Sequence, residues 1–322
     1  MIARRCAASL RSFSASGSSC QQVGHQPCRN LSRLTQTPKP HSNSADYGSV
    51  HRGLRPSIVR PVLFCTFASG SAFLGAAAFS HERSEQEHAA FRWRRHPNSQ
   101  TILGKAKEAW NALTPEQKAV YGIIGLNIGV FGLWRIPSLQ GLMGRLFLLP
   151  LPPLRMQPAF SALTSTFSHA SIGHLAFNMI AFSSFGGHLA QILGAEQFVA
   201  VFLTAGMVSS LTSYAGRLRS LKGGHSLGAS GAVYACFAAI ALLYPAATAQ
   251  FIFLPGVPIQ MGTLLPVLMG TDILGVLLGW RYLDHLGHLG GAAFGLLYTL
   301  YGHHLWSRRE QVLRAVGWTD EK

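Results

Sequence analysis

The chain has 322 residues, of which 48% are hydrophobic and only 12% are charged, about half the charged fraction of an ordinary soluble domain. The apolar residues form separate blocks of membrane-spanning length, which excludes a soluble enzyme and favours a protein that crosses a membrane several times. The net charge of +15 is not organised as a basic stripe interleaved with aromatic residues, which argues against nucleic-acid binding.

The first sixty residues have the composition of a mitochondrial transit peptide. They contain nine of the 27 basic residues and many serines, and Asp46 is their only acid. The opening run MIARRCAASLRSFSAS can form a short helix with apolar residues opposite its arginines. A secretory signal would need an apolar region near the start, and none precedes residue 61. We therefore expect residues 1–60 to be a transit peptide, or otherwise a disordered basic tail.

Seven apolar stretches follow this tail. Backbone polar groups must pair within their own segment in lipid, so stretches of this length predict helices rather than strands. The first is an extra span at 61–80, followed by a polar linker at 81–117. Six more spans are expected at 119–134, 172–193, 198–214, 227–244, 264–280 and 283–306. The sequence thus predicts an all-α membrane protein with a six-helix core at 118–307, one extra N-terminal transmembrane helix, and a polar C-terminal tail at 308–322.

Local signals mark several helix boundaries. The run Thr114-Pro115-Glu116-Gln117 is a capping box with proline at the first helical position. Ser171 is expected to cap the span at 172–193, and Ser226 the span at 227–244. The stretch 136–166 is apolar but interrupted by prolines, so we expect a loop partly sunk in the membrane interface.

Ser230 and His288 are polar residues inside predicted spans, where such side chains are costly and often functional. A lone serine in a membrane helix usually only packs, but a neutral imidazole can take the proton of a serine hydroxyl. Ser230 lies about three residues into its span and His288 about five, on the same side of the membrane. At 1.5 Å per residue their depths differ by roughly 3 Å, so a hydrogen bond between them is allowed.

His174 and Asn178 are four residues apart and therefore share one face at the start of the span at 172–193. That start lies on the same side of the membrane as Ser230 and His288. Side-chain N–H groups at this depth can stabilise the oxyanion of a tetrahedral intermediate. The alternative is an ordinary interhelical hydrogen-bond pair.

Small residues recur at a spacing of four in two of the spans. Gly291 and Gly295 form a GxxxG motif, and Gly231 with Ala235 forms a similar small-residue pair. This spacing predicts close packing of the helices that carry them.

The polar and glycine motifs together resemble those of the rhomboid proteases. The match covers Gly-x-Ser-Gly, His-x-x-Gly-x-x-x-Gly and His-x-x-x-Asn, here at Gly228, Ser230 and Gly231, at His288, Gly291 and Gly295, and at His174 and Asn178. Tyr234 matches an aromatic residue that stacks on the catalytic histidine in bacterial members. The longer runs STFSHASIGHLAFNM, SLGASGAVY and GWRYLDHLGHLGGAAFG are similar to the mitochondrial presenilins-associated rhomboid-like subfamily.

This resemblance covers about residues 119–306 and implies both a fold and an activity. The family has a six-helix core, and this subfamily has an extra N-terminal span. Its members cleave transmembrane segments with a Ser-His dyad that requires no acid, metal or cofactor. Here Ser230 would be the nucleophile, His288 the base, and His174 and Asn178 the oxyanion donors. The implied setting is the mitochondrial inner membrane, with the lipid bilayer and single-pass membrane proteins as partners.

Three further residues in or near the spans are weaker candidates for a functional role. Asp272 is placed by depth too far from His288 to orient it, so an interhelical hydrogen bond is expected instead. Asp284 is four residues before His288 and could touch it, but an acid at a helix start also complements the helix dipole. His285 with His288 could be a metal pair, although no HExxH motif or carboxylate cluster accompanies them.

The distribution of basic residues predicts an orientation in the membrane. With seven spans, the N-terminal tail and the site share one side, and that side holds 16 of the 27 basic residues. The site is therefore expected to open toward the matrix.

Two rival functions remain: an inactive rhomboid-like protein that binds membrane clients, and a transporter or channel, which the lack of internal repeats disfavours.

Overall fold

The computed structural model describes residues 56–90, 101–152, 154, 156, 158–219, 223–250 and 256–319. The chain divides into two compact units, 1–39 and 40–322, and all the described residues belong to the second. The predicted transit peptide therefore lies outside the described residues, except for its last five positions.

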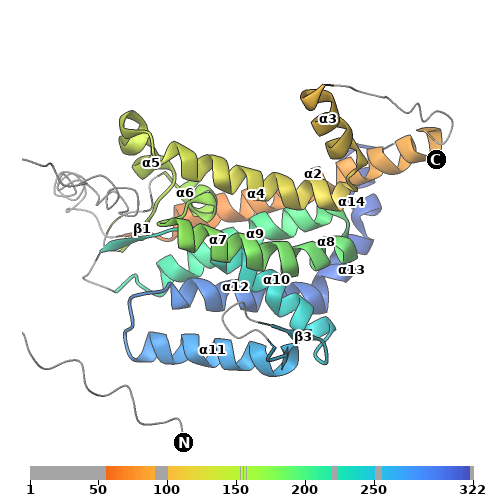
Figure 1. Cartoon of the computed structure of the whole chain (residues 1–322). Coiled ribbons are helices and arrows are strands. Elements are labelled where there is room, and N and C mark those ends of the chain that lie inside the picture. The colour runs from red at the N-terminus through yellow and green to blue at the C-terminus, as the bar shows by residue number, and fades with distance from the viewer. Residues whose placement is uncertain are drawn as a thin grey trace, which may run out of the picture. The chain divides into compact units, whose positions relative to one another are not determined.

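A helix or a continuous helical run coincides with each predicted apolar stretch (Figure 1). The single helices are α2 (Val59–Ala90), α4 (Pro115–Leu133), α9 (Ala195–Ala215), α10 (Ser230–Leu243) and α11 (Met261–Leu277). The helical runs are α7 (Ile172–Ala181), η3 (Phe182–Gly186) and α8 (Gly187–Leu193), and then α12 (His285–Leu297), η4 (Tyr298–Gly302) and α13 (His303–Ser307). Both η3 and η4 are single π-helical turns within their runs.

Two of these helices are long and apolar enough to cross a membrane on their own, Val59–Ser84 within α2 and the whole of α9. A third candidate is α4 together with η1 (Pro137–Leu139) and α5 (Gln140–Leu146), after a bend of 96°. The helices α10 and α11 are apolar but shorter, at 14 and 17 residues. The count of seven spans therefore stays a prediction, while a helical membrane protein is supported.

The predicted helix starts are correct in two cases and wrong in one. Thr114 and Gln117 form the expected capping box at α4, and the Ser171 hydroxyl accepts from the His174 N–H at the start of α7. Ser226 does not cap α10, which begins only at Ser230 and has no side-chain cap. The reason is Gly228, whose φ of 130° turns the chain between Ser226 and the helix.

Within the described residues, four short strands and several small helices connect the long helices. Strand β1 (Leu149–Leu151) pairs antiparallel with β2 (Gly224–Ser226), and β3 (Thr248–Ala249) pairs with β4 (Ile259–Gln260). The prolines of the stretch 136–166 separate η1, α5 and β1 from α6 (Ser161–Thr164) and η2 (Ser165–Phe167). The linker contains α3 (Ile102–Ala112), and the polar C-terminal stretch contains α14 (Arg309–Ala315).

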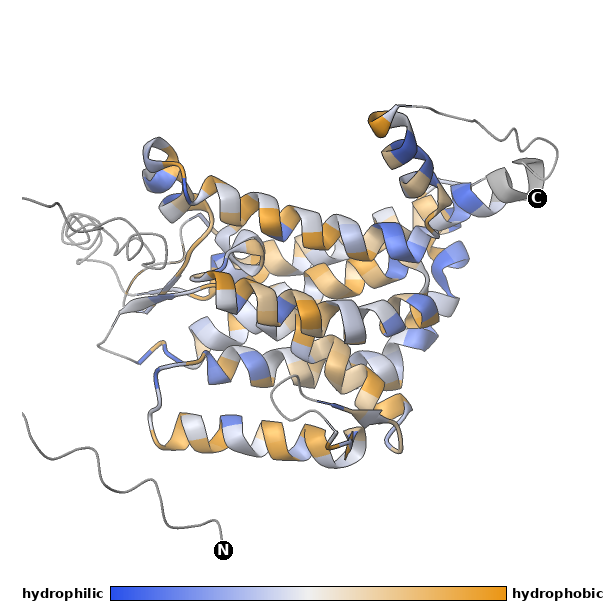
Figure 2. Cartoon of the chain, viewed as in Figure 1, coloured by the Kyte–Doolittle hydropathy of each residue, from blue (hydrophilic) through white to orange (hydrophobic). Residues whose placement is uncertain are grey.

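The helices α9, α10 and α12 form the centre of the core. Figure 2 shows hydrophobic residues along α4 and α11, with hydrophilic residues concentrated in α3 and near helix ends. A methyl group on Gly291 would overlap the Gly231 carbonyl, and one on Gly295 would overlap the Ala235 carbonyl. The close approach of α10 and α12 predicted from the GxxxG motif is therefore confirmed. This approach places the start of α10 beside the start of α12.

Candidate active site

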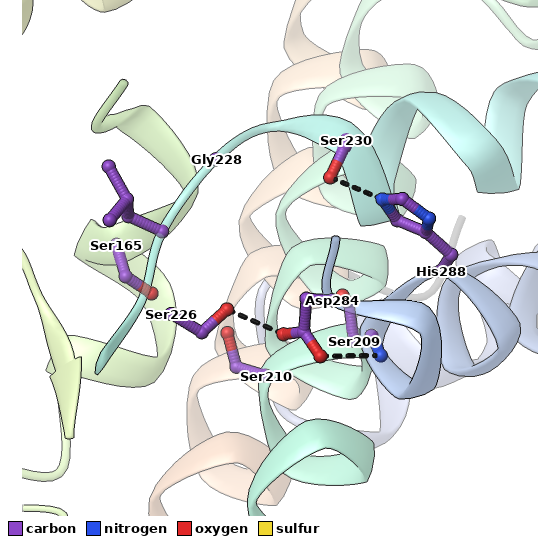
Figure 3. Close-up of a pocket in the computed structure, with 10 residues that line it drawn as sticks. Ser165, Ser209, Ser210, Ser226, Gly228, Ser230, Asp284 and His288 are labelled. Atoms are coloured by element: carbon purple, nitrogen blue, oxygen red, sulfur yellow. Dashed lines mark hydrogen bonds between the residues drawn. The ribbon is translucent and has the colours of Figure 1, made fainter. Parts of the chain in front are cut away.

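Ser230 and His288 face each other across the contact between α10 and α12. Ser230 is the first residue of α10, and His288 lies in the first turn of α12. The Ser230 hydroxyl oxygen is 2.9 Å from His288 Nε2, a hydrogen-bonding distance (Figure 3). His288 is 9% exposed, whereas Ser230 is half-buried. This is the arrangement in which an imidazole can accept the hydroxyl proton.

The other edge and the face of the His288 ring are also held. Its Nδ1 is 3.2 Å from Asp272 Oδ1 on α11. Tyr234, one turn after Ser230, stacks on the ring with centroids 5.0 Å apart and planes 8° apart. Because an ionised carboxylate only accepts hydrogen bonds, the proton is assigned to Nδ1, and Nε2 is left free to accept from Ser230.

The prediction that Asp272 lies too deep to orient His288 is wrong. That prediction assumed that the span continues to Trp280, whereas α11 ends at Leu277. Asp272 is thus five residues before the end of α11, and His288 is three residues after the start of α12. A difference of two residues is only about 3 Å in depth, which a carboxylate side chain can reach.

Asp284 belongs to a different hydrogen-bond network, although it lies one helical turn before His288. Its carboxylate caps α12 by accepting from the Gly287 N–H, and it accepts from the hydroxyls of Ser213 and Ser226. Arg217 adds an ion pair at 3.0 Å. Asp284 therefore joins α9, β2 and α12, and fastens the segment that leads to Ser230.

His174 lies against that same segment. Its ring is close enough that a methyl group on Gly228 would meet it at 3.0 Å, so the limited space favours glycine there in addition to the positive φ. Asn178 is 3% exposed, and its side-chain N–H donates to the His174 carbonyl in its own helix at 2.9 Å. An amide has two N–H donors, so one remains for another partner.

His169 is a site neighbour that the sequence did not single out. It is buried in the loop before α7, with its ring 4.9 Å from the ring of His174. Burial, with a smaller effect of His174, lowers the pKa of His169 to about 4. His169 therefore stays neutral near pH 7 and adds no positive charge beside His174.

A small polar pocket opens next to the Ser230–His288 pair (Figure 3). Besides Ser230, four serines contribute to its lining: Ser165, Ser209, Ser210 and Ser226. Asp284 and Gly228 line it as well. The pocket therefore offers several hydroxyl groups beside the nucleophile candidate.

The arrangement of His285 and His288 differs from the metal pair considered as an alternative. His285 Nδ1 is 2.6 Å from Asp272 Oδ1, the same oxygen that faces His288 Nδ1. The remaining nitrogen of His288 faces Ser230. Among the described residues, no three His, Cys, Asp or Glu side chains are grouped as metal ligands would be.

Comparison with known proteins adds an independent view of the chain. Residues 157–305 match the model of the rhomboid domain. The mitochondrial presenilin-associated rhomboid-like protein of Homo sapiens is 38% identical over 269 residues, which cover 80% of this chain and 70% of the relative. The corresponding protein of Mus musculus is also 38% identical, with 71% of its length covered. The mitochondrial rhomboid protein 1 of Saccharomyces cerevisiae is 33% identical over 63% of this chain and 59% of its own.

Proposed function

The chain belongs to the rhomboid family, and from that membership we propose that it is an intramembrane serine endopeptidase of the mitochondrial inner membrane. Ser230 is the nucleophile and His288 the general base. The observation that carries the proposal is the 2.9 Å contact between the Ser230 hydroxyl and His288 Nε2, at one end of a helical core. The proposed activity is the cleavage of single-pass membrane proteins within or next to their transmembrane segments.

The first step is acylation of Ser230. His288 Nε2 takes the hydroxyl proton as Ser230 Oγ attacks the carbonyl carbon of the scissile bond. The C–N bond then breaks, and His288 returns the proton to the leaving amine. Asp272 keeps the other proton of His288 on Nδ1, and the stacked Tyr234 limits rotation of the ring.

The oxyanion that forms in this step needs donors near Ser230. Ser230 is the first residue of α10, and the first N–H groups of a helix have no partner in that helix. The Ser230 N–H and the positive end of the helix dipole therefore suit a developing negative charge. His174 and the second N–H of Asn178 are the proposed additional donors.

Deacylation requires a water molecule, which His288 activates so that it attacks the acyl carbon and restores the Ser230 hydroxyl. The serine-lined pocket beside Ser230 supports this step, because its hydroxyl groups can hold water within reach of the site. A helical peptide bond is hydrogen-bonded and shielded, so the substrate has to unwind locally. Segments with small or helix-breaking residues near one interface are the expected substrates.

The proposed location rests on the relatives and on the N-terminal composition. Both the animal and the yeast relatives are named as mitochondrial proteins. We propose that residues 1–60 serve as the transit peptide, that 61–80 add a seventh span, and that 118–307 form the protease core. The site then opens toward the matrix, because the basic residues are more numerous on that side.

The decisive experiment is labelling of the purified protein in detergent with a fluorophosphonate, which reacts with activated serines. We expect the wild type to be labelled and both Ser230→Ala and His288→Ala to lose labelling, by a factor on the order of 10⁶ for a nucleophile or its base. The matched control is Ser183→Ala, an exposed serine of η3 that donates to the Ile180 carbonyl in the same helical run, and this variant should label like the wild type. Peptide mapping should locate the adduct on Ser230.

The outcome that would overturn the proposal is a folded wild type that is not labelled, or labelling that persists in Ser230→Ala. An unlabelled, well-folded wild type would favour the rival function, an inactive rhomboid-like protein that binds membrane clients. Thermal unfolding of each variant separates this outcome from simple misfolding.

A further inference from the structure

One carboxylate oxygen in this molecule lies within hydrogen-bonding distance of two histidines. Asp272 Oδ1 lies 2.6 Å from His285 Nδ1 and 3.2 Å from His288 Nδ1. Both histidines come from the first turn of α12, whereas Asp272 comes from α11. A carboxylate oxygen has two lone pairs, so it can accept from both Nδ1–H groups at once. The shorter of the two bonds goes to His285, the histidine that the proposed mechanism does not use.

His285 is enclosed mainly by α11 and the segment that follows it. Its side chain is buried, with 4% of the residue exposed. A methyl group on Gly275 would overlap its ring, and the Trp280 ring lies 6.1 Å away. No described residue forms a hydrogen bond with its Nε2. The polar contact that His285 makes is therefore the one from Nδ1 to Asp272.

Filling this space with an imidazole lowers the stability of the fold, because a buried polar atom without a hydrogen-bond partner is unfavourable. A leucine would fill a similar volume without an unpaired Nε2. The bond to Asp272 is the feature that only a polar side chain provides. This bond matters because the Asp272 side chain has two rotatable bonds. Without it, the remaining partners of the carboxylate would be His288 and the Tyr234 hydroxyl, and the carboxylate would be freer to turn away from His288.

We propose that His285 is a positioning residue of the protease, acting through Asp272. Its Nδ1–H fixes the Asp272 carboxylate, so that the second lone pair of Oδ1 stays directed at His288 Nδ1. Because Asp272 is on α11, the same bond ties α11 to the start of α12. This inference rests on the proposed function, since His288 is the base only if Ser230 is the nucleophile.

The test uses two substitutions of nearly equal size and shape. In His285→Asn the amide nitrogen takes the place of Nδ1 and can still donate to Asp272, whereas His285→Leu has no donor. With the full chain in detergent, the maximal rate of fluorophosphonate labelling should fall about tenfold in His285→Leu and stay within about twofold of the wild type in His285→Asn. The probe concentration at half-maximal rate should not change, because His285 does not touch the probe.

A double-mutant cycle shows whether the effect passes through Asp272. In the background of Asp272→Asn, adding His285→Leu should change the labelling rate less than twofold. An equal tenfold loss in both backgrounds would overturn the proposal, and so would a wild-type rate in His285→Leu. If His285→Leu does not fold, His285→Gln replaces it, because its amide nitrogen reaches the position of Nε2 rather than Nδ1.

A second readout does not depend on activity, so it separates failure of this inference from failure of the proposed function. Proton NMR of the protein with ¹⁵N-labelled histidine should show two low-field Nδ1–H signals, from His285 and His288. His285→Leu should remove one signal and shift or broaden the other. A second signal that is unchanged by His285→Leu would overturn the positioning role, whether or not the wild type reacts with the probe.

Discussion

Asp272 is the residue at which the structure most changes the interpretation of the site. The resemblance to the rhomboid proteases implies a dyad that needs no acid, yet here a buried carboxylate lies 3.2 Å from His288, the proposed base. A carboxylate in this position holds the imidazole in the tautomer that can accept the serine proton. It also stabilises the imidazolium that forms when the proton is transferred.

We expect Asp272→Asn to lower the fluorophosphonate labelling rate on the order of 10²-fold while leaving the protein folded. The amide keeps the size of the side chain but removes its charge and one acceptor oxygen. The control is Thr271→Ala, its neighbour on an exposed face of α11, which donates only to the Val267 carbonyl of its own helix and should label like the wild type. Labelling of Asp272→Asn at the wild-type rate would show that Ser230 and His288 act without the acid.

Two independent physical reasons favour glycine at position 228. Its φ of 130° is strained for any other residue, and a methyl group there would press on the His174 ring. Its N–H donates to the Ser165 carbonyl, which ties the segment before Ser230 to η2. The backbone of this segment, and not a capping side chain, therefore positions Ser230 at the start of α10.

At the scale of elements, the contact between α10 and α12 decides whether the site can form. The two helices carry Ser230 and His288, and they approach so closely that backbone atoms of one face glycines of the other. Asp284, at the start of α12, binds Ser213, Ser226 and Arg217. These contacts hold α9 and β2 against the start of α12. The distance between Ser230 and His288 is thus set by packing of backbones and by one half-buried carboxylate.

We expect Gly291→Ala and Gly295→Ala each to destabilise the fold by about 1–3 kcal/mol, because the added methyl groups meet backbone carbonyls that cannot move cheaply. The matched control is Gly125→Ala in α4, where an added methyl group meets no atom within 4 Å. Thermal unfolding in detergent measures the difference. Equal midpoints for Gly291→Ala and Gly125→Ala would contradict close packing as the role of these glycines.

At the scale of the whole described unit, the contacts of α2 bear on the orientation of the site. Near its start, Cys65 packs with Leu149 and Leu151 of β1, the strand that pairs with the segment before Ser230. Near its end, Ala77 and Ala78 pack with Leu313 of α14. The start of α2 is therefore on the side of the site, and its end is on the side of α14.

Ion pairs at that second end support the same arrangement. His81 lies 3.1 Å from Glu310 of α14, and Arg83 pairs with Glu196 at the start of α9. Glu196 follows the predicted span at 172–193, and Glu310 follows the predicted span at 283–306. Both contacts lie at the end of α2 that is away from the site. The C-terminus is then on the opposite side from the N-terminal tail, as an odd number of membrane crossings requires.

We expect an epitope tag after residue 322 to be protected from protease in intact mitochondria and digested once the outer membrane is ruptured. Seven spans with the N-terminal tail in the matrix place the C-terminus in the intermembrane space. A resident matrix protein, protected in both samples, is the control. Protection of the tag after rupture would place the C-terminus in the matrix and contradict the predicted orientation.

The sequence by itself determined the helical segments and the candidates for the chemistry. Apolar length indicated each helical stretch, the capping box and Ser171 marked helix starts, and the spacing of Gly291 and Gly295 indicated the close contact. Counting residues from the membrane surface placed Ser230 and His288 at similar depths. These features are local or periodic, so they can be read from the chain without knowing its neighbours.

The tertiary structure alone decided how Asp272 and His285 are used, and which distant residues bind Asp284. Their roles depend on where α11 ends, how the segment before α10 turns at Gly228, and which helices meet at the start of α12. An error of three residues in one helix end was enough to move Asp272 away from His288 in a depth estimate. Hydrogen bonds require atoms to lie within about 3.2 Å, and only packing between distant segments places atoms that closely.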